Sequence, residues 1–167
     1  MKPPFERVVE AHGAAVLRVC RAVVGPDDAE DAWSETFISA LAAYPALPAD
    51  ANVEAWLVTI AHRKAIDLLR VRARTAIPVG GVPDRPSALG TPDPEAIELW
   101  DAVRVLPDKQ RQSIAYHYLG GLPFADVAGI LGGTPAAARR AAADGIATLR
   151  SRYGAHPEQA RERGGRS

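Results

Sequence analysis

Positively charged side chains at helical spacing are the residues of this sequence best suited to binding chemistry. Arg63, Arg70 and Arg74 stand at i, i+7 and i+11, so a helix would place them on one face. Such a face can hold phosphate groups, and the alternative is a solvated surface with an internal ion pair to Asp67. The candidate set on and beside this face is Arg63, Lys64, Asp67, Arg70, Arg72 and Arg74.

A second basic group lies in an Ala-rich segment near the end of the chain. Arg139 and Arg140 would project from a helix there, and Arg150, about three turns further on, could reach a phosphate. The alanines beside them offer only apolar contacts, for example to a thymine methyl group. The candidate contact residues are Thr134, Ala136, Ala137, Arg139, Arg140 and Arg150.

Carboxylates gather at a third place, directly after Pro26. They complement the dipole at the start of a helix, and they can also form a surface for a binding partner. The two roles are compatible. The residues concerned are Asp28, Glu30, Asp31 and Glu35.

Residue types that carry catalysis or hold metals form no recognisable constellation. Cys20 is the single cysteine, which excludes an internal disulfide, and the four histidines are scattered without metal-ligand spacing. The glycine pairs at 80–81 and 132–133 lack the Lys-Ser/Thr of a phosphate loop. We therefore expect no enzymatic activity, no metal and no cofactor.

The composition favours a helical, cytoplasmic protein. Of 167 residues, 47% are hydrophobic and 24% charged, which is enough for one core or two small ones. Alanine is abundant and alternating β-branched runs are rare. A formal net charge of zero argues against a general polycation but permits local basic faces. No segment approaches the roughly 20 apolar residues of a membrane span, so we expect no membrane insertion.

The elements that must position these residues are helices. The first half predicts helices over 5–23, from the acidic run after Pro26 to Pro45, and over 53–74. Trp33, Phe37 and Trp56 lie on apolar stripes, so we expect core packing rather than base stacking. The predicted stripes are Ala29, Ala32, Trp33, Thr36, Phe37, Ala40, Leu41 and Tyr44, and then Val53, Trp56, Leu57, Ile60, Ala61, Ala65 and Leu68.

The second half predicts helices over 94–105, 107–119, 123–131 and 135–152. Thr134 can cap the last of them, and its buried stripe would be Ala138, Ala142, Ile146, Leu149 and Tyr153. A helix, a tight Gly-Gly turn and a second helix are typical of a helix-turn-helix, whose second helix enters the major groove.

Pro and Gly recur between the two halves and indicate a flexible linker. The predicted fold is therefore all-α, with two small helical domains, residues 1–74 and 95–153, joined by a linker over 75–94 and followed by a fraying tail over 154–167. Such a linker permits the domains to lie apart or to pack together.

In this order, the segments resemble the extracytoplasmic-function sigma factors over nearly the whole chain. Three motifs carry the resemblance: Asp28-Ala29-Glu30-Asp31 with Glu35-Thr36-Phe37, the stretch from Trp56 to Arg70, and Leu106 to Arg111 followed by Tyr118 to Ala128. The resemblance implies a sigma factor that binds core RNA polymerase and directs transcription initiation at promoter DNA. It also implies an anti-sigma factor as a candidate partner.

By the same resemblance, the carboxylates would dock on polymerase, the 63–74 face would bind and melt the minus-10 element, and the last helix would bind the minus-35 element. The sequence departs from the family at Arg63, where many members have Asn, and at Ala141 and Asp144, where basic residues are common. A stand-alone helix-turn-helix regulator and a helical protein-binding adaptor are the alternatives.

Overall fold

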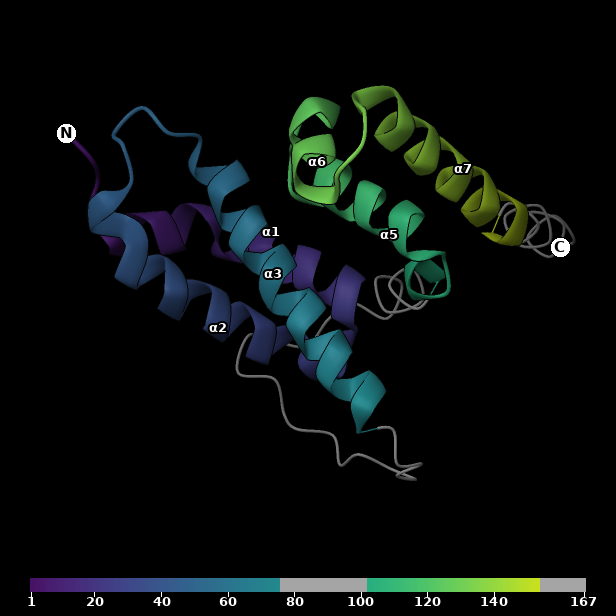
Figure 1. Cartoon of the computed structure of the whole chain (residues 1–167), viewed down its shortest axis with the longest axis horizontal. Helices are drawn as coiled ribbons and strands as arrows, with labels where there is room; N and C mark the ends of the chain where they lie inside the picture. Colours follow the sequence, from purple (N-terminus) through teal and green to yellow (C-terminus); the bar gives the residue numbers. More distant parts are fainter. Residues whose placement is uncertain (76–101, 154–167) are drawn as a thin grey trace, which may run out of the picture.

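The computed structural model describes residues 1–75 and 102–153, which contain helices and connections but no strand. The predicted all-helical fold is confirmed. Figure 1 shows two helical groups side by side. The elements are α1 (Phe5–Val24), α2 (Pro26–Ala43), the 3-10 helix η1 (Tyr44–Ala46), α3 (Val53–Arg74), α5 (Asp108–Ile114), the π-helical turn η2 (Ala115–Leu119), α6 (Phe124–Leu131) and α7 (Pro135–Tyr153).

The first group consists of α1, α2 and α3, packed against one another. Gly25 connects α1 to α2 with φ 88° and ψ 170°, a conformation that essentially only glycine adopts. Pro26 then occupies the first turn of α2, where its missing N–H costs nothing. The Asn52 side chain accepts a hydrogen bond from the Ala55 N–H at 3.1 Å and caps α3.

The second group consists of α5, α6 and α7. The Thr134 hydroxyl accepts a hydrogen bond from the Ala137 N–H at 3.1 Å, which confirms the predicted cap of α7. Gly145 lets α7 approach α5 closely, because a Cβ there would lie 2.6 Å from Cδ1 of Ile114. The helix predicted over 107–119 is continuous but changes character. Its last turn, η2, widens into the π form, and the Gly120 N–H donates to the Ala115 carbonyl at 2.9 Å.

The larger hydrophobic core spans both groups, and a smaller cluster of Leu106, Ile114 and Ala142 lies within the second. Tyr116 and Leu122 of the second group, at 0% and 1% exposure, belong to the same cluster as Val19, Leu57 and Val58 of the first. Contacts of α1 with η2 and α5, and of α3 with α6, cross the boundary. The domains therefore pack together in this structure, a question that the linker composition left open.

Several predicted segments lie outside the residues that the structure describes. They are the tail over 154–167, the linker apart from Thr75, and most of the helix over 94–105, of which 102–104 is helical.

Candidate nucleic-acid interface

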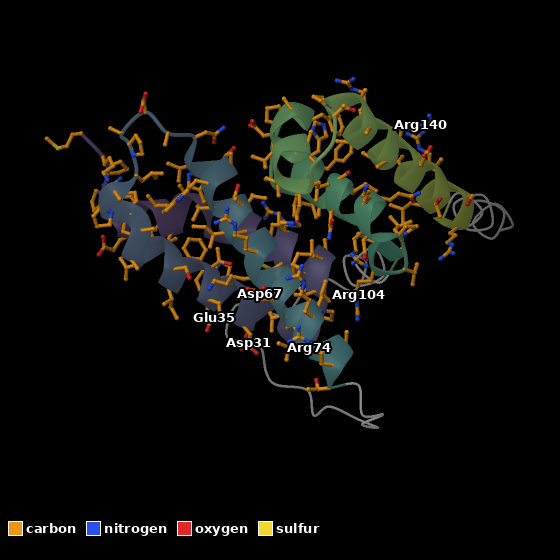
Figure 2. The ribbon with its side chains drawn as sticks, in the orientation of Figure 1. Asp31, Glu35, Asp67, Arg74, Arg104 and Arg140 are labelled. Atoms are coloured by element: carbon orange, nitrogen blue, oxygen red, sulfur yellow. The ribbon has the colours of Figure 1, made fainter. Side chains whose placement is uncertain are left out.

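The basic face of α3 reaches solvent along its length. Arg63, Asp67, Arg70 and Arg74 are exposed, and Lys64 is half-buried. Figure 2 shows Asp67 and Arg74 on this helix. Within residues 1–75 and 102–153 no ion pair joins Asp67 to Arg63. The guanidinium of Arg63 is therefore not neutralised by its own helix, and the face keeps a positive balance.

Arg72 and Asp28 pair with each other, although one was predicted to contact DNA and the other polymerase. The Arg72 Nη2 donates to Oδ1 of Asp28 at 2.6 Å, and its Nε lies 2.5 Å from Oδ2. This two-point geometry joins the start of α2 to the end of α3. The Asp28 side chain is 10% exposed and that of Arg72 is 53% exposed. Asp28 thus faces the fold rather than a partner.

The outward face of α2 combines acidic and apolar side chains. Asp31 and Glu35 are exposed, and Figure 2 shows them at the edge of the molecule. Ile38 and Leu41 continue the same face and are 64% and 57% exposed. The placement of Leu41 on the buried stripe was therefore wrong. Ile38 was missed, although its spacing from Asp31 and Glu35, i+7 and i+3, places it on their face. Glu30 is half-buried.

The aromatic side chains of the first group pack inward, as predicted. Phe37 is buried, and its ring centroid lies 4.7 Å from that of Trp33. The Trp33 Nε1 donates to the Gly13 carbonyl at 2.9 Å. Trp56 is half-buried beside Tyr44. Stacking on an unpaired base is therefore not the role of Trp33 or Phe37 in this arrangement.

The helix-turn-helix presents its second helix, α7, to solvent. Ala136, Ala137, Arg140 and Arg150 are exposed, and Figure 2 shows Arg140 on the side of the molecule away from Asp31 and Glu35. The exposed Arg139 lies over the Phe124 ring, with its Cζ 5.4 Å from the centroid. Along the predicted stripe, Ala138 and Ala142 are buried, and Ile146 and Leu149 are half-buried. Asp144 is exposed, so it reduces the positive charge of this surface.

A cleft of about 320 Å³ lies between parts of α3 and α6. It is lined by Ala55, Thr59, His62, Arg63, Ala125, Asp126, Gly129 and Ile130. Beside it, the Tyr116 hydroxyl and the His62 Nδ1 are 2.5 Å apart. Burial raises the pKa of Tyr116, so its hydroxyl keeps its proton. Burial, and then the charge of Arg63, lower the pKa of His62. No pattern in the sequence predicts this contact, which joins residues 54 positions apart.

Residues 1–75 and 102–153 contain neither a metal-binding cluster nor a helix of membrane-spanning character. No group of three or more His, Cys, Asp or Glu side chains there is placed to hold a metal ion. None of the helices described is long and apolar enough to cross a membrane.

Known proteins match both halves of the chain. The profile of sigma-70 region 2 matches residues 8–75, and that of sigma-70 region 4 matches residues 96–149. The extracytoplasmic-function (ECF) sigma factor SigC of Mycobacterium tuberculosis is 31% identical over 135 residues, which are 77% of this chain and 71% of SigC. The chain belongs to the ECF sigma factor family. The ECF sigma factor BldN of Streptomyces coelicolor is 31% identical over 137 residues, and the match spans 52% of its length, about half.

Two solved structures resemble this chain in fold. The sigma factor RpoE of Bartonella quintana, in complex with the anti-sigma factor NepR, has a TM-score of 0.73 at 22% identity, over 88% of this chain and 94% of that one. CnrH, in complex with the cytosolic domain of CnrY, has a TM-score of 0.67 at 23% identity, over 91% and 88%. These likenesses establish the shared fold.

Proposed function

We propose that this chain is an alternative sigma factor that binds core RNA polymerase in the cytoplasm and directs it to promoter DNA, without catalysis of its own. The observation that carries the proposal is that each matched region presents an exposed basic helix face, α3 in region 2 and α7 in region 4. Two separate DNA-facing surfaces on one chain suit recognition of two promoter elements.

We assign the surfaces as follows. Residues 1–74 dock on polymerase and act on the minus-10 element, 75–94 connect, and 95–153 bind the minus-35 element. Single-stranded DNA would follow the α3 face, where Arg63, Arg70 and Arg74 contact phosphates. Duplex DNA would receive α7 in its major groove, with Arg139 and Arg140 near its start.

The acidic and apolar face of α2 is the proposed polymerase-docking surface. Asp31 and Glu35 supply charge, and the exposed Ile38 and Leu41 supply apolar area that a partner would bury. RpoE and CnrH were each solved with a partner, NepR and the cytosolic domain of CnrY. We therefore include an anti-sigma factor among the proposed partners.

The test is a binding assay with core RNA polymerase, followed by run-off transcription on fragmented genomic DNA. Stable association with promoter-dependent transcripts supports the proposal. Duplex binding without polymerase association would favour a stand-alone regulator, and neither activity would favour an adaptor. Ile38→Ser should weaken polymerase binding about tenfold or more, because a buried apolar side chain is worth about 1.5–3 kcal/mol. Val105→Ser, at a residue that is 61% exposed outside this face, is the matched control.

A further inference from the structure

The two domains are in close van der Waals contact where η2 meets α1 and α3. Gly120, directly after η2, has no room for a side chain, because a Cβ there would lie 2.8 Å from the Tyr116 carbonyl oxygen; it would also lie 3.3 Å from Cγ2 of Val58 and 3.4 Å from Cγ2 of Val19, so the first domain packs closely on this turn. Val19 and Val58 are 1% and 2% exposed. The domains are therefore joined by a buried apolar contact between η2, α1 and α3.

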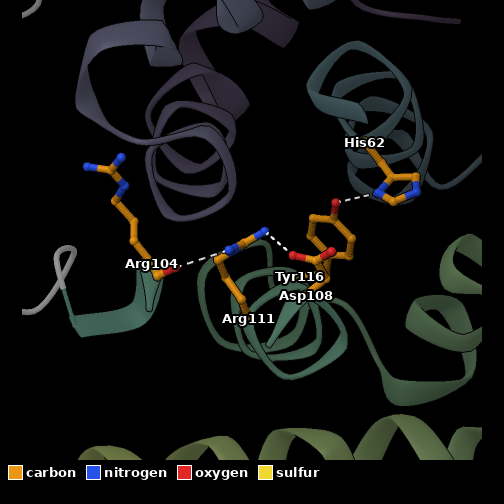
Figure 3. A network of polar contacts seen from close by, with 5 residues as sticks. All are labelled: His62, Arg104, Asp108, Arg111 and Tyr116. Atoms are coloured by element: carbon orange, nitrogen blue, oxygen red, sulfur yellow. Dashed lines mark hydrogen bonds and ion pairs between the residues drawn. The ribbon is translucent and has the colours of Figure 1, made fainter. Parts of the chain in front are cut away.

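One hydrogen bond fixes the alignment of this contact. Tyr116 comes from η2 of the second domain, and Figure 3 shows its hydroxyl pointing at His62 of α3. Tyr116 is fully buried. If the domains separated, water would replace His62 as its partner, whereas a slip within the closed state would leave a buried hydroxyl unpaired. The pair thus selects one closed arrangement.

Closure also affects the proposed minus-10 surface. Arg63, which begins the α3 basic face, lines the cleft with Asp126 of α6 opposite. A DNA strand following α3 through this cleft would bring its phosphates towards the carboxylate of Asp126, and like charges repel. The closed arrangement therefore hinders single-strand binding at the start of α3.

The proposed function requires the domains to separate. The minus-10 and minus-35 elements lie about 25 base pairs apart, which is roughly 85 Å of B-DNA at about 3.4 Å per base pair. A compact chain of 167 residues has a radius of gyration of about 15 Å, so its opposite ends are only about 40 Å apart. No rigid placement of the closed form reaches both elements.

We propose that Tyr116 is a latch that holds the free chain closed and inactive, with the minus-35 domain seated on α1 and α3, and that release of Tyr116 from His62 accompanies promoter engagement. The inhibitory part of this inference rests on the proposed function. The latch itself is a property of the free chain and can be tested without DNA or polymerase.

The experiment measures the distance between the two domains of the full chain by single-molecule Förster resonance energy transfer. In a Cys20→Ala background, dyes are placed at two exposed positions, Ala14→Cys on α1 and Ala147→Cys on α7. The free chain should populate mainly a short distance. Tyr116→Phe, which removes only the hydroxyl, should raise the ratio of open to closed molecules about fivefold. Tyr118→Phe removes the same group from a side chain that is 56% exposed and should leave the ratio unchanged.

The outcomes separate the latch from the sigma function. A free chain that is mostly open, or equal ratios for the two Tyr→Phe variants, would overturn the latch. Core polymerase with promoter DNA should shift the population to long distances, and a chain that stays closed while supporting transcription would overturn the inhibitory role. Failure to bind polymerase, with the Tyr116 effect intact, would instead contradict the proposed function.

Discussion

His62 is half-buried where α3 meets η2, and its protonation state determines how it can pair with Tyr116. Neutral His62 can accept the hydroxyl proton at Nδ1. Protonated His62 cannot accept it, and the Tyr116 hydroxyl would then need another acceptor in its buried site. The charged and titratable groups around the pair are Arg63 on α3 and Asp126 on α6 and, near Tyr116, Cys20 on α1 and Arg111 on α5.

The latch should therefore weaken in acid. Burial and Arg63 hold the pKa of His62 in the closed form below its ordinary value of 6.5, so protons bind preferentially to the open form. The contribution of His62 to the stability of the closed form is fully present above pH 6.5. It is lost as the pH falls through the lowered pKa of His62 in the closed form. We expect the open fraction, measured by energy transfer, to rise from about pH 7.5 to about pH 5. The same dependence in His62→Gln would contradict this assignment.

The ion pair between Asp28 and Arg72 should contribute to stability. Asp28→Asn keeps the shape of the side chain but removes the charge from a two-point contact. We expect the free energy of unfolding to fall by about 1–2 kcal/mol, with the lower end favoured because Arg72 is half-exposed. Denaturant titration measures this change. Asp31→Asn, at an exposed position on the same helix, should change stability by less than about 0.5 kcal/mol.

These residues also show where sequence-based prediction fails. The carboxylate cluster after Pro26 was visible in the sequence, but the partner of Asp28 is 44 positions away and follows only from the packing of α2 on α3. Leu41 fits the helical period of the buried stripe as well as Ala40 does. Only the packing of α1 and α3 on α2 determines that Ala40 is buried and Leu41 exposed.

At the scale of elements, the helices of the first domain were largely predictable. The third helix was predicted over 53–74 and observed over the same residues, and the first differs by one residue at its end. Prolines, acidic first turns and apolar periodicity are local signals, so they determine helix boundaries with little influence from the rest of the fold. The π-helical form of η2 was not predictable, because no local sequence signal marks a turn whose Gly120 N–H donates to the Ala115 carbonyl.

The junction between α1 and α2 depends on a glycine, and a second glycine provides its control. Gly25→Ala would force a side chain into the φ 88°, ψ 170° conformation and against Arg104, so we expect a loss of about 1–3 kcal/mol in unfolding free energy. Gly129→Ala lies within α6 with no atom within 4 Å of the new Cβ. It should raise stability by up to about 1 kcal/mol. Thermal or denaturant unfolding distinguishes the two, and a destabilised Gly129→Ala would contradict the geometry of α6.

At the scale of the whole molecule, the free chain should bind promoter duplex poorly. Its net charge is zero, Asp144 reduces the positive charge of α7, and closure prevents both elements from being bound together. We expect a dissociation constant weaker than about 1 μM at physiological salt, with polymerase supplying most of the affinity. Fluorescence anisotropy with a promoter fragment measures it. Nanomolar binding by the isolated chain would contradict this expectation.

The domain arrangement is the part of the structure that the sequence did not determine. The two-domain order was visible because each domain has its own helical pattern and a Pro/Gly segment stands between them. Closure depends on contacts such as those of Val19 and Val58 with Gly120, which are remote in sequence and have no periodic signature. An apolar residue facing the other domain looks the same in sequence as one facing its own core.

The single cysteine has a consequence for how cells can control this protein. Cys20 is 1% exposed, and burial raises the pKa of its thiol to about 12. Oxidants attack the thiolate, which at neutral pH would be only about one molecule in 10⁵. Peroxide and disulfide stress should therefore leave the Cys20 thiol of the folded chain unmodified, and a response to such stress that passes through this chain would depend on oxidation of some other group.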